Sequence, residues 1–324
     1  MAQGGAVRSV PFIGNDWRKG RSMIEIDDLT KRYGDKTAVD RLSFVVEPGV
    51  VTGFLGPNGA GKSTTMRMIA GLDRPTSGTV RVNGKHYPGA TAPMAELGIL
   101  LDARSVHPGL SARSNLLALA RTAGIGRRRV DEVIELAGLA EVASTRAGGF
   151  SLGMGQRLGV AAALLGQPQT VVLDEPVNGL DPDGVRWIRL LLKSLAAEGR
   201  TVFVSSHLMS EMAQTATRLV VLGRGKLITE TSVADFVDHA AAGVLVRTPE
   251  TVRLGQLLAA PGITVINDGT DLLRVSGTTA EQIGAAAWRA HLPVYELTPT
   301  HASLEEAFMQ VTKDSIEYHA GATR

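Results

Sequence analysis

Short runs of apolar residues recur between residues 23 and 223 and predict the strands of a sheet. Residues 23–49 contain two strand-like runs around a turn. Further runs of strand length, rich in Val, Leu and Phe, stand at 50–56, 170–174, 201–206 and 218–223. The segment 183–199 between two of these runs spaces its apolar residues as a helix does. This alternation predicts an α/β fold, in which crossover helices connect the strands of a parallel sheet.

One stretch with purely helical spacing interrupts the alternation. Residues 111–147 place apolar side chains three and four positions apart, first in "SARSNLLALARTAG" and then in "RRRVDEVIELAGLAEV". We therefore expect a separate helical lobe, inserted at about residues 88–166.

The pattern changes again near the C-terminal end. We expect, in order, strand 243–248, helix 250–260, strand 262–267, strand 270–275, helix 278–291 and strand 293–298. This β-α-β-β-α-β order is typical of a ferredoxin-like domain. A last amphipathic helix begins at Ser303, with Glu306 three residues later as in a capping box.

These patterns divide the chain into five parts. We expect a flexible extension at 1–22, a large domain at 23–230, a linker at 231–242, an accessory α/β domain at 243–313 and a tail at 314–324.

Composition narrows the class of protein. The chain has 324 residues, of which 44% are hydrophobic and 20% charged, enough apolar material for a sizeable core. Its net charge of +2 is small, and the basic run at 127–129 fits a solvated helix start, so we expect no nucleic-acid partner. The absence of cysteine excludes disulfides, thiol catalysis and Cys-based zinc sites.

No apolar run approaches the roughly 20 residues that span a bilayer, and the first residues lack a secretory signal. We expect a soluble, cytoplasmic protein that docks on a membrane protein.

A glycine-rich loop carries the most specific motif of the chain. The sequence reads Gly56-Pro57-Asn58-Gly59-Ala60-Gly61-Lys62-Ser63-Thr64, which fits the P-loop pattern G-x-x-x-x-G-K-[ST] between a strand and a helix. Such glycines let backbone N–H groups turn inward around an anion, and the helix N-terminus adds partial positive charge. We expect Lys62 to reach the β- and γ-phosphates of a nucleotide and Ser63 to bind Mg²⁺.

Two acids close the apolar run at 170–174. A charge at the end of a buried strand is costly unless a cation lies nearby. We expect Asp174 to hold Mg²⁺ through water and Glu175 to orient or deprotonate the attacking water. His207 follows the next strand of the pattern, where a contact with the γ-phosphate is expected. Tyr33 is a candidate to stack on the base.

With these motifs in order, the chain over about residues 23–230 resembles the nucleotide-binding subunits of ABC transporters. The resemblance rests on Tyr33, the P-loop at 56–64, the segment 151–156, the acids at the end of 170–175, "NGLD" at 178–181 and His207. It implies an ABC-type domain of the P-loop NTPase class, with a RecA-like core plus the helical lobe, followed by the small ferredoxin-like domain.

The resemblance also implies how the glycine-rich stretch before residue 157 works. Residues 151–156 occupy the place of the family's signature, which closes on the γ-phosphate held by the P-loop of a second subunit packed head to tail. Ser151 offers a hydroxyl, Gly153 and Gly155 allow close approach, and the helix that follows presents its positive end. Hydrolysis would then release the dimer. Asp181, in the family's D-loop, would lie across the interface.

The implied cofactors are ATP and Mg²⁺. The catalytic residues would be Glu175, His207 and Lys62, and the metal ligands Ser63, Asp174 and, less directly, Asp102. The residues in contact with nucleotide would be Tyr33, Gly56, Pro57, Asn58, Gly59, Ala60, Gly61, Lys62, Ser63, Thr64, Asp102, Ser151, Gly153, Gly155, Gln156 and Asp181.

The chain departs from the family pattern at several positions. Phe150 stands for the signature leucine and Leu152 for its first glycine, a variant that resembles ATPases of bacterial drug export and peptide-antibiotic immunity. Asp102 stands near the place of the expected Q-loop glutamine, and Val177 replaces a threonine that relatives often carry. The "LEEAF" of residues 304–308 also resembles that subfamily.

We therefore expect an ATPase subunit, paired with itself or a paralogue, that drives a separate permease. Its site would be the cytoplasmic face of the membrane, and its cargo a drug, antibiotic or other hydrophobic or peptide compound. The alternative is a soluble ABC-type ATPase that acts on ribosomes or DNA. Such proteins usually have two nucleotide domains or long coiled-coil arms, which this sequence lacks.

Overall fold

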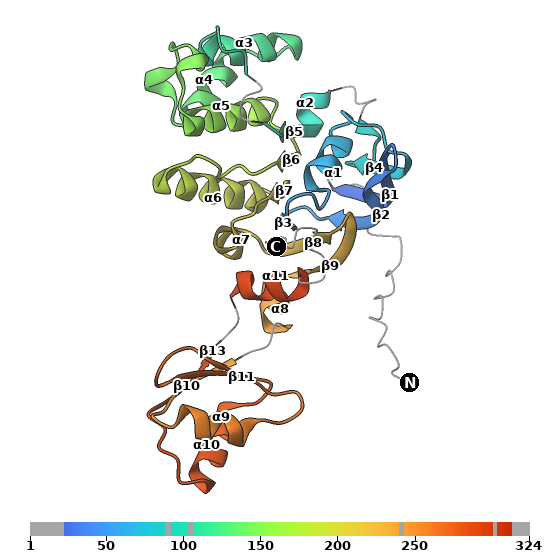
Figure 1. The fold of residues 1–324 in the computed structure, drawn as a ribbon. Coiled ribbons are helices and arrows are strands. Elements are labelled where there is room, and N and C mark those ends of the chain that lie inside the picture. Colours follow the sequence, from blue (N-terminus) through green and yellow to red (C-terminus); the bar gives the residue numbers. More distant parts are fainter. Residues whose placement is uncertain (1–22, 88–91, 103–105, 240–242, 301–302, 313–324) are drawn as a thin grey trace, which may run out of the picture.

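The computed structural model describes residues 23–87, 92–102, 106–239, 243–300 and 303–312. Figure 1 shows a helical lobe, a layered α/β core beneath it and a small α/β unit at the far end. The expected extension at 1–22 and tail at 314–324 lie outside the described residues. Within those described, no helix has the length and apolar character to cross a membrane.

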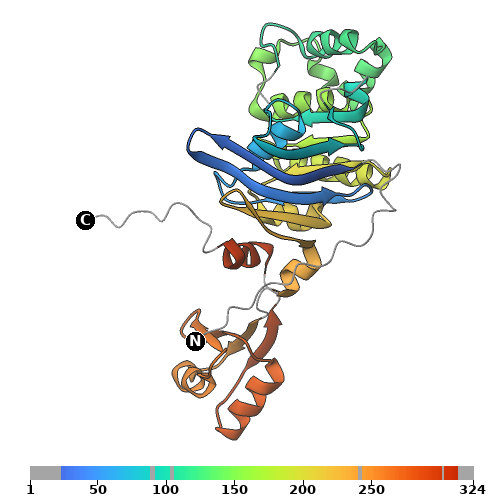
Figure 2. The same cartoon turned by 90° about the vertical axis from the view of Figure 1, so that its right-hand side faces the viewer.

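Two sheets build the core. The six-stranded sheet has the order β5 (Leu97–Leu100), β6 (Thr170–Leu173), β7 (Thr201–Ser205), β3 (Val51–Leu55), β8 (Arg218–Gly223) and β9 (Lys226–Ser232). All neighbours are parallel except β8 and β9. The predicted parallel sheet is thus confirmed. A three-stranded antiparallel sheet has the order β2 (Lys36–Val46), β1 (Ile24–Tyr33) and β4 (Ser77–Val82), and Figure 2 shows its blue strands β1 and β2 in front.

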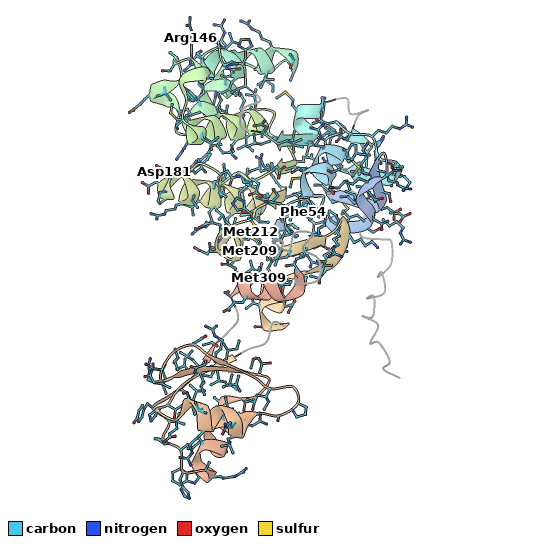
Figure 3. All side chains as sticks on the ribbon, in the orientation of Figure 1. Phe54, Arg146, Asp181, Met209, Met212 and Met309 are labelled. Atoms are coloured by element: carbon cyan, nitrogen blue, oxygen red, sulfur yellow. The ribbon has the colours of Figure 1, made fainter. Side chains whose placement is uncertain are left out.

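Apolar side chains fill both faces of the parallel sheet. Every residue of β3, β6 and β7 is buried, as expected for strands covered on two sides. Between the two sheets the rings of Phe44, Phe54 and Phe203 meet, with centroids 4.8–5.8 Å apart. Figure 3 labels Phe54 in this layer. Helices α6 (Pro182–Ala197) and α7 (Met209–Thr215) supply residues to the core cluster on the other face.

The helical lobe is built from α3 (Ala112–Thr122), α4 (Arg127–Leu136) and α5 (Leu152–Leu164). Short helices lie at α2 (Pro93–Glu96), η2 (Ala140–Val142) and η3 (Ala147–Gly149). The predicted start of the lobe near residue 88 is wrong, because β5 belongs to the central sheet and pairs with β6. Helix α5 contributes to two apolar clusters, with Leu158 in the lobe and Val160 in the core.

The C-terminal unit has the predicted order of elements. It consists of β10 (Gly243–Arg247), α9 (Thr251–Leu258), β11 (Thr264–Asn267), β12 (Leu272–Ser276), α10 (Ala280–Arg289) and β13 (Glu296–Thr300). The antiparallel order β11-β12-β10-β13 is that of a ferredoxin-like fold. Its helices cover one face of the sheet, around buried Val246 and Ile283.

Two helices flank this unit in sequence but pack elsewhere. Phe236 of α8 (Val233–His239) and Phe308 of α11 (Leu304–Thr312) lie in the core cluster of the large domain. Figure 3 places Met209 and Met212 of α7 directly above Met309 of α11, and α11 contacts both α7 and α8. The expected linker at 231–242 and the expected place of the last helix in the accessory domain are therefore both wrong, because the apolar faces of α8 and α11 are buried against the large domain.

Candidate functional site

The P-loop joins β3 to helix α1 (Lys62–Ile69) at the C-terminal edge of the parallel sheet. Gly59 and Gly61 have φ values of 82° and 100°, a region that L-residues rarely adopt. A Cβ on Gly61 would also lie 2.6 Å from the carbonyl oxygen of Ala38. The loop therefore requires glycine here for backbone conformation and for space, as anion-binding loops of this kind do.

Lys62 lies at the start of α1 and is largely buried. Its Nζ donates to the carbonyl oxygens of Gly56 at 2.6 Å and Pro57 at 3.3 Å. Burial lowers the pKa of Lys62, and the negative charges of Glu175 and Asp174 act in the opposite direction. A buried ammonium at the start of this helix is placed to bind a phosphate, and the two carboxylates suit a cation bound together with that phosphate.

The two acids follow β6 directly, as predicted. The hydroxyl of Ser205, at the end of the neighbouring β7, donates to the carboxylate of Asp174 and accepts the backbone N–H of Glu175 at 2.9 Å. Glu175 has a φ of 50°, which for a non-glycine residue costs about 1–3 kcal/mol and persists only where neighbours hold it. Such strain, held by fixed contacts, is common at functional sites.

His207 lies against Glu175. Its backbone N–H donates to Oε2 of Glu175 at 3.2 Å, and its Nδ1 lies 2.8 Å from the same oxygen. About half of the His207 side chain is exposed, so the pair is open to solvent on one side. The structure thus brings the predicted base and the predicted histidine together.

A cavity of about 470 Å³ is lined by half of the residues predicted to contact nucleotide and by the two acids. Its lining comes from Tyr33, Lys36, Ala38, Asn58, Gly59, Ala60, Gly61, Lys62, Ser63, Thr64, Asp174 and Glu175. The cavity thus runs from the aromatic ring of Tyr33 along the P-loop to the two acids. This order matches that of a bound nucleotide, with the base beside Tyr33, the phosphate chain along the P-loop and the bond to be hydrolysed beside the two acids.

The donor set fits Mg²⁺ bound together with a nucleotide. Ser63 is exposed in the cavity that Asp174 also lines. Among the described residues no group of three or more His, Cys, Asp or Glu could hold an ion without help. Mg²⁺ commonly takes one or two carboxylates and completes its shell with water and phosphate oxygens. Asp102 is exposed two residues after β5, at the same edge of the sheet, but does not line the cavity.

The signature residues lie at a different place. Ser151 and Gly155 line a second cavity of about 400 Å³ together with Leu152 and Phe150. Ser151 is the N-cap of α5 and accepts the N–H of Met154 at 3.2 Å, so the positive end of this helix faces outward.

Two predicted contacts serve the chain's own structure. Asp181 caps α6 by accepting the N–H of Gly184 at 2.8 Å, and Figure 3 shows it at the start of that helix. Gln156 is buried, and its amide donates to the backbone oxygen of Glu175.

Sequence reasoning missed the residues that hold the site in place. Ser205 ends a strand beside the two acids, and its position after "TVFV" is the feature that could have indicated it. Asp73 accepts the hydroxyl of Tyr33 at 3.0 Å and is paired with Arg67 at 2.8 Å. These contacts join residues 31 and 40 positions apart, which no local motif reveals.

A strand, P-loop and helix, two acids that follow a parallel strand one position removed in the same sheet, and an inserted helical lobe define an ATP-binding cassette. Residues 39–178 match the ABC transporter family, and residues 242–305 match a domain of unknown function, DUF8746.

Curated relatives extend the match. The chain is 43% identical over 212 residues to the bacitracin transport ATP-binding protein BcrA of Bacillus licheniformis, covering 64% of this chain and 69% of that protein. It is 36% identical to the uncharacterized ABC transporter ATP-binding protein YhcH of Bacillus subtilis, covering 92% and 98%. It is 39% identical to the Nod factor export ATP-binding protein I of Rhizobium etli, covering 69% and 73%.

Solved structures agree. An ATP-binding subunit of an ABC transporter aligns with a TM-score of 0.62 and 25% identity, over 67% of this chain and 92% of that one. A bacterial ABC transporter cassette in dimeric form aligns with a TM-score of 0.60 and 27% identity, over 65% and 98%. The chain belongs to the ATP-binding proteins of ABC transporters. It is an ATPase that powers a separate permease.

Proposed function

We propose that this ATPase drives export of a peptide antibiotic or another hydrophobic compound, as part of a head-to-tail dimer on the cytoplasmic face of the membrane. The export class is supported by relatives named for bacitracin transport and Nod factor export. The variant signature around Leu152 supports the same subfamily. None of the relatives reported above is named for work on ribosomes or DNA.

The proposal of a dimer rests on the separation of two cavities within one chain. The cavity with the P-loop and Glu175 lacks Ser151 and Gly155, which line the other cavity. A second subunit, homologous or identical, would bring its own Ser151 to the nucleotide held here. The partner's α5 would then add a helix N-terminus to the phosphate chain.

In this mechanism each residue of the cavity has one task. Tyr33 supports the base, the P-loop N–H groups and Lys62 bind the phosphates, and Ser63 and Asp174 hold Mg²⁺, which neutralises developing charge when bound. Glu175 accepts the proton of the attacking water. His207 orients that carboxylate and contacts the γ-phosphate. Asp102 would contact Mg²⁺ from its outer shell, and Asp181 would lie at the dimer interface.

The dimer is tested with Glu175→Gln, which should bind ATP without hydrolysing it. We expect light scattering to show a monomer without ATP and a dimer with ATP and Mg²⁺. Adding Ser151→Arg to this variant should keep ATP binding and abolish dimerisation, because the long cation would occupy the partner's contact. A Glu175→Gln protein that binds ATP and stays monomeric would contradict self-pairing and favour a paralogous partner.

Export is tested in cells that carry the chain and its permease. We expect them to tolerate more bacitracin-like peptide than cells with the Glu175→Gln variant. Equal tolerance at equal protein levels would exclude this cargo class.

A further inference from the structure

A buried hydrogen bond joins the signature helix to the residue that carries the proposed general base. Gln156 lies in the second turn of α5 and is only 3% exposed. Its Nε2 donates to the backbone oxygen of Glu175 at 3.0 Å. A buried side-chain amide that donates a hydrogen bond to a backbone carbonyl of another element fixes the distance between the two elements.

The backbone of Glu175 is held from both sides. Its N–H donates to Ser205 of the core sheet, and its C=O accepts from Gln156 of α5. The same C=O also accepts the N–H of Asn178 at 3.2 Å, and His207 holds the carboxylate itself. Because a φ of 50° is unusual for a non-glycine residue, these backbone contacts hold it in place. The only one of the three backbone partners that comes from the helix beginning at the signature is Gln156.

The same helix lies closely against the segment after Glu175. A Cβ on Gly153 would stand 2.7 Å from the carbonyl oxygen of Gly179. Gly179 has a φ of 74°, and the side chain of Leu152 covers its open side. The first turns of α5 and residues 175–179 are thus in contact at two separated points, and they would shift together.

We propose that Gln156 is a positioning residue for Glu175, which makes the angle of the carboxylate depend on the place of α5. This inference rests on the proposed function, in which Glu175 is the base and Ser151 meets the partner's nucleotide. Ser151 caps the helix that Gln156 belongs to. A nucleotide seated on Ser151 by the partner would then act, through Gln156, on the base of this subunit's own site.

Gln156→Met tests the contact, because it removes the donor and keeps an unbranched side chain. We expect kcat for ATP hydrolysis to fall roughly 10- to 100-fold, as for a misplaced catalytic group, with KM within about two-fold of wild type. In the Glu175→Gln background, Gln156→Met should still dimerise with ATP. If the methionine variant does not fold, Gln156→Ala removes the donor with a smaller side chain and should cause the same loss.

The matched control is Arg129→Met. Arg129 also ties α5 through backbone oxygens, at Leu164 and Leu165, but at the other end of the helix. It should leave kcat unchanged. A normal kcat in both Gln156 variants, or an equal fall in the control, would overturn the inference. If Glu175→Gln itself hydrolyses ATP at the wild-type rate, the proposed function is wrong. This result is distinguishable from a normal kcat in the Gln156 variants, which contradicts only the inference on Gln156.

Discussion

Tyr33 is fixed by charged neighbours on more than one side. Its hydroxyl donates to Asp73, and the ammonium of Lys31 lies 4.9 Å from its ring centroid. Burial is the largest cause of the raised pKa of Tyr33, followed by its hydrogen bond to Asp73. Arg67 makes two hydrogen bonds to the same carboxylate. The ring is therefore held ready for a stacked base, which lowers the entropy lost on binding.

Asp73→Ala should release that ring. We expect the KM for ATP to rise about three-fold with kcat unchanged, the pattern for loss of a contact made equally in ground and transition states. Asp131→Ala is the control, since Asp131 pairs with Arg113 in the helical lobe and does not line the cavity; its side chain is more exposed than that of Asp73, 49% against 18%. Steady-state kinetics decide, and an unchanged KM in the Asp73 variant would show that the ring needs no such support.

Glu230 carries a charge that the fold disfavours. Burial raises its pKa, Arg218 opposes the shift and Glu47 adds to it. A carboxyl whose folded pKa lies above its unfolded pKa destabilises the protein at pH above both values. Stability therefore rises as pH falls through the folded pKa.

Glu230→Gln should raise the Tm at pH 7 by about 2 °C, and thermal melts of the two proteins should converge near pH 4. A lower Tm at pH 7 would show that the pair with Arg218 outweighs burial.

At the scale of elements, the start of α5 depends on the absence of a side chain. Gly153→Ala would place a methyl group against the Gly179 carbonyl and push the helix N-terminus away. In the Glu175→Gln background we expect loss of the ATP-dependent dimer and a Tm lower by several degrees, about 1–3 kcal/mol of overpacking.

Gly149→Ala is the matched control, because a Cβ there meets no atom within 4 Å. It should melt and dimerise as the parent does. Dimerisation of the Gly153 variant with normal affinity would mean that the helix can tilt without losing its partner.

Helix α11 contributes to the stability of the ATP-binding domain. Phe308 is buried in its core cluster, whereas the next residue, Met309, is 54% exposed. We expect Phe308→Ala to destabilise the protein by about 3 kcal/mol and Met309→Ala by less than about 0.5 kcal/mol, measured by denaturant unfolding. Equal effects would place α11 outside the core.

The sequence predicted elements better than it predicted their partners. Periodicity located six strands of the two core sheets but missed β4, β5 and β9, and fixed motif spacing located the P-loop, Asp174 and Glu175. The amphipathic pattern of α11 shows that one of its faces is buried, but it does not identify the surface that covers this face. The position of α11 beside α7 was therefore not predicted. In the same way, the part of Gln156 in the site depends on a tertiary contact with Glu175, 19 residues away.

On the scale of the whole molecule, the ferredoxin-like unit is inserted between two helices of the large domain. Gly243, its first strand residue, pairs with Thr300, its last, and the Thr300 hydroxyl donates to the Gly243 carbonyl at 3.0 Å. The chain thus enters and leaves the unit at neighbouring points. An ion pair of 2.8 Å between Arg274 and Glu306 links it to α11, but both side chains are about half exposed, so it adds little stability.

Replacing residues 243–300 by a short Gly/Ser linker should therefore leave a folded ATPase. The unit has its own apolar cluster, and α11 keeps its contacts with α7 and α8. We expect nucleotide binding and the Tm of the ATP-binding domain to be retained. A deletion of 243–312 also removes α11 and should be much less stable. Calorimetry of the two proteins decides, and equal instability would show that the unit is needed for the fold.

The adjacent ends of this unit also restrict how it can swing. A domain joined by one linker can rotate about any axis. A domain joined by two neighbouring linkers rotates about the line through its two attachment points. Gly243 and Thr300 are those attachments. The unit follows α8 and precedes α11 in the chain, and α11 contacts α7, whose preceding loop carries His207. We therefore expect a partner that binds and rotates this unit to change the hydrolytic end of the cavity.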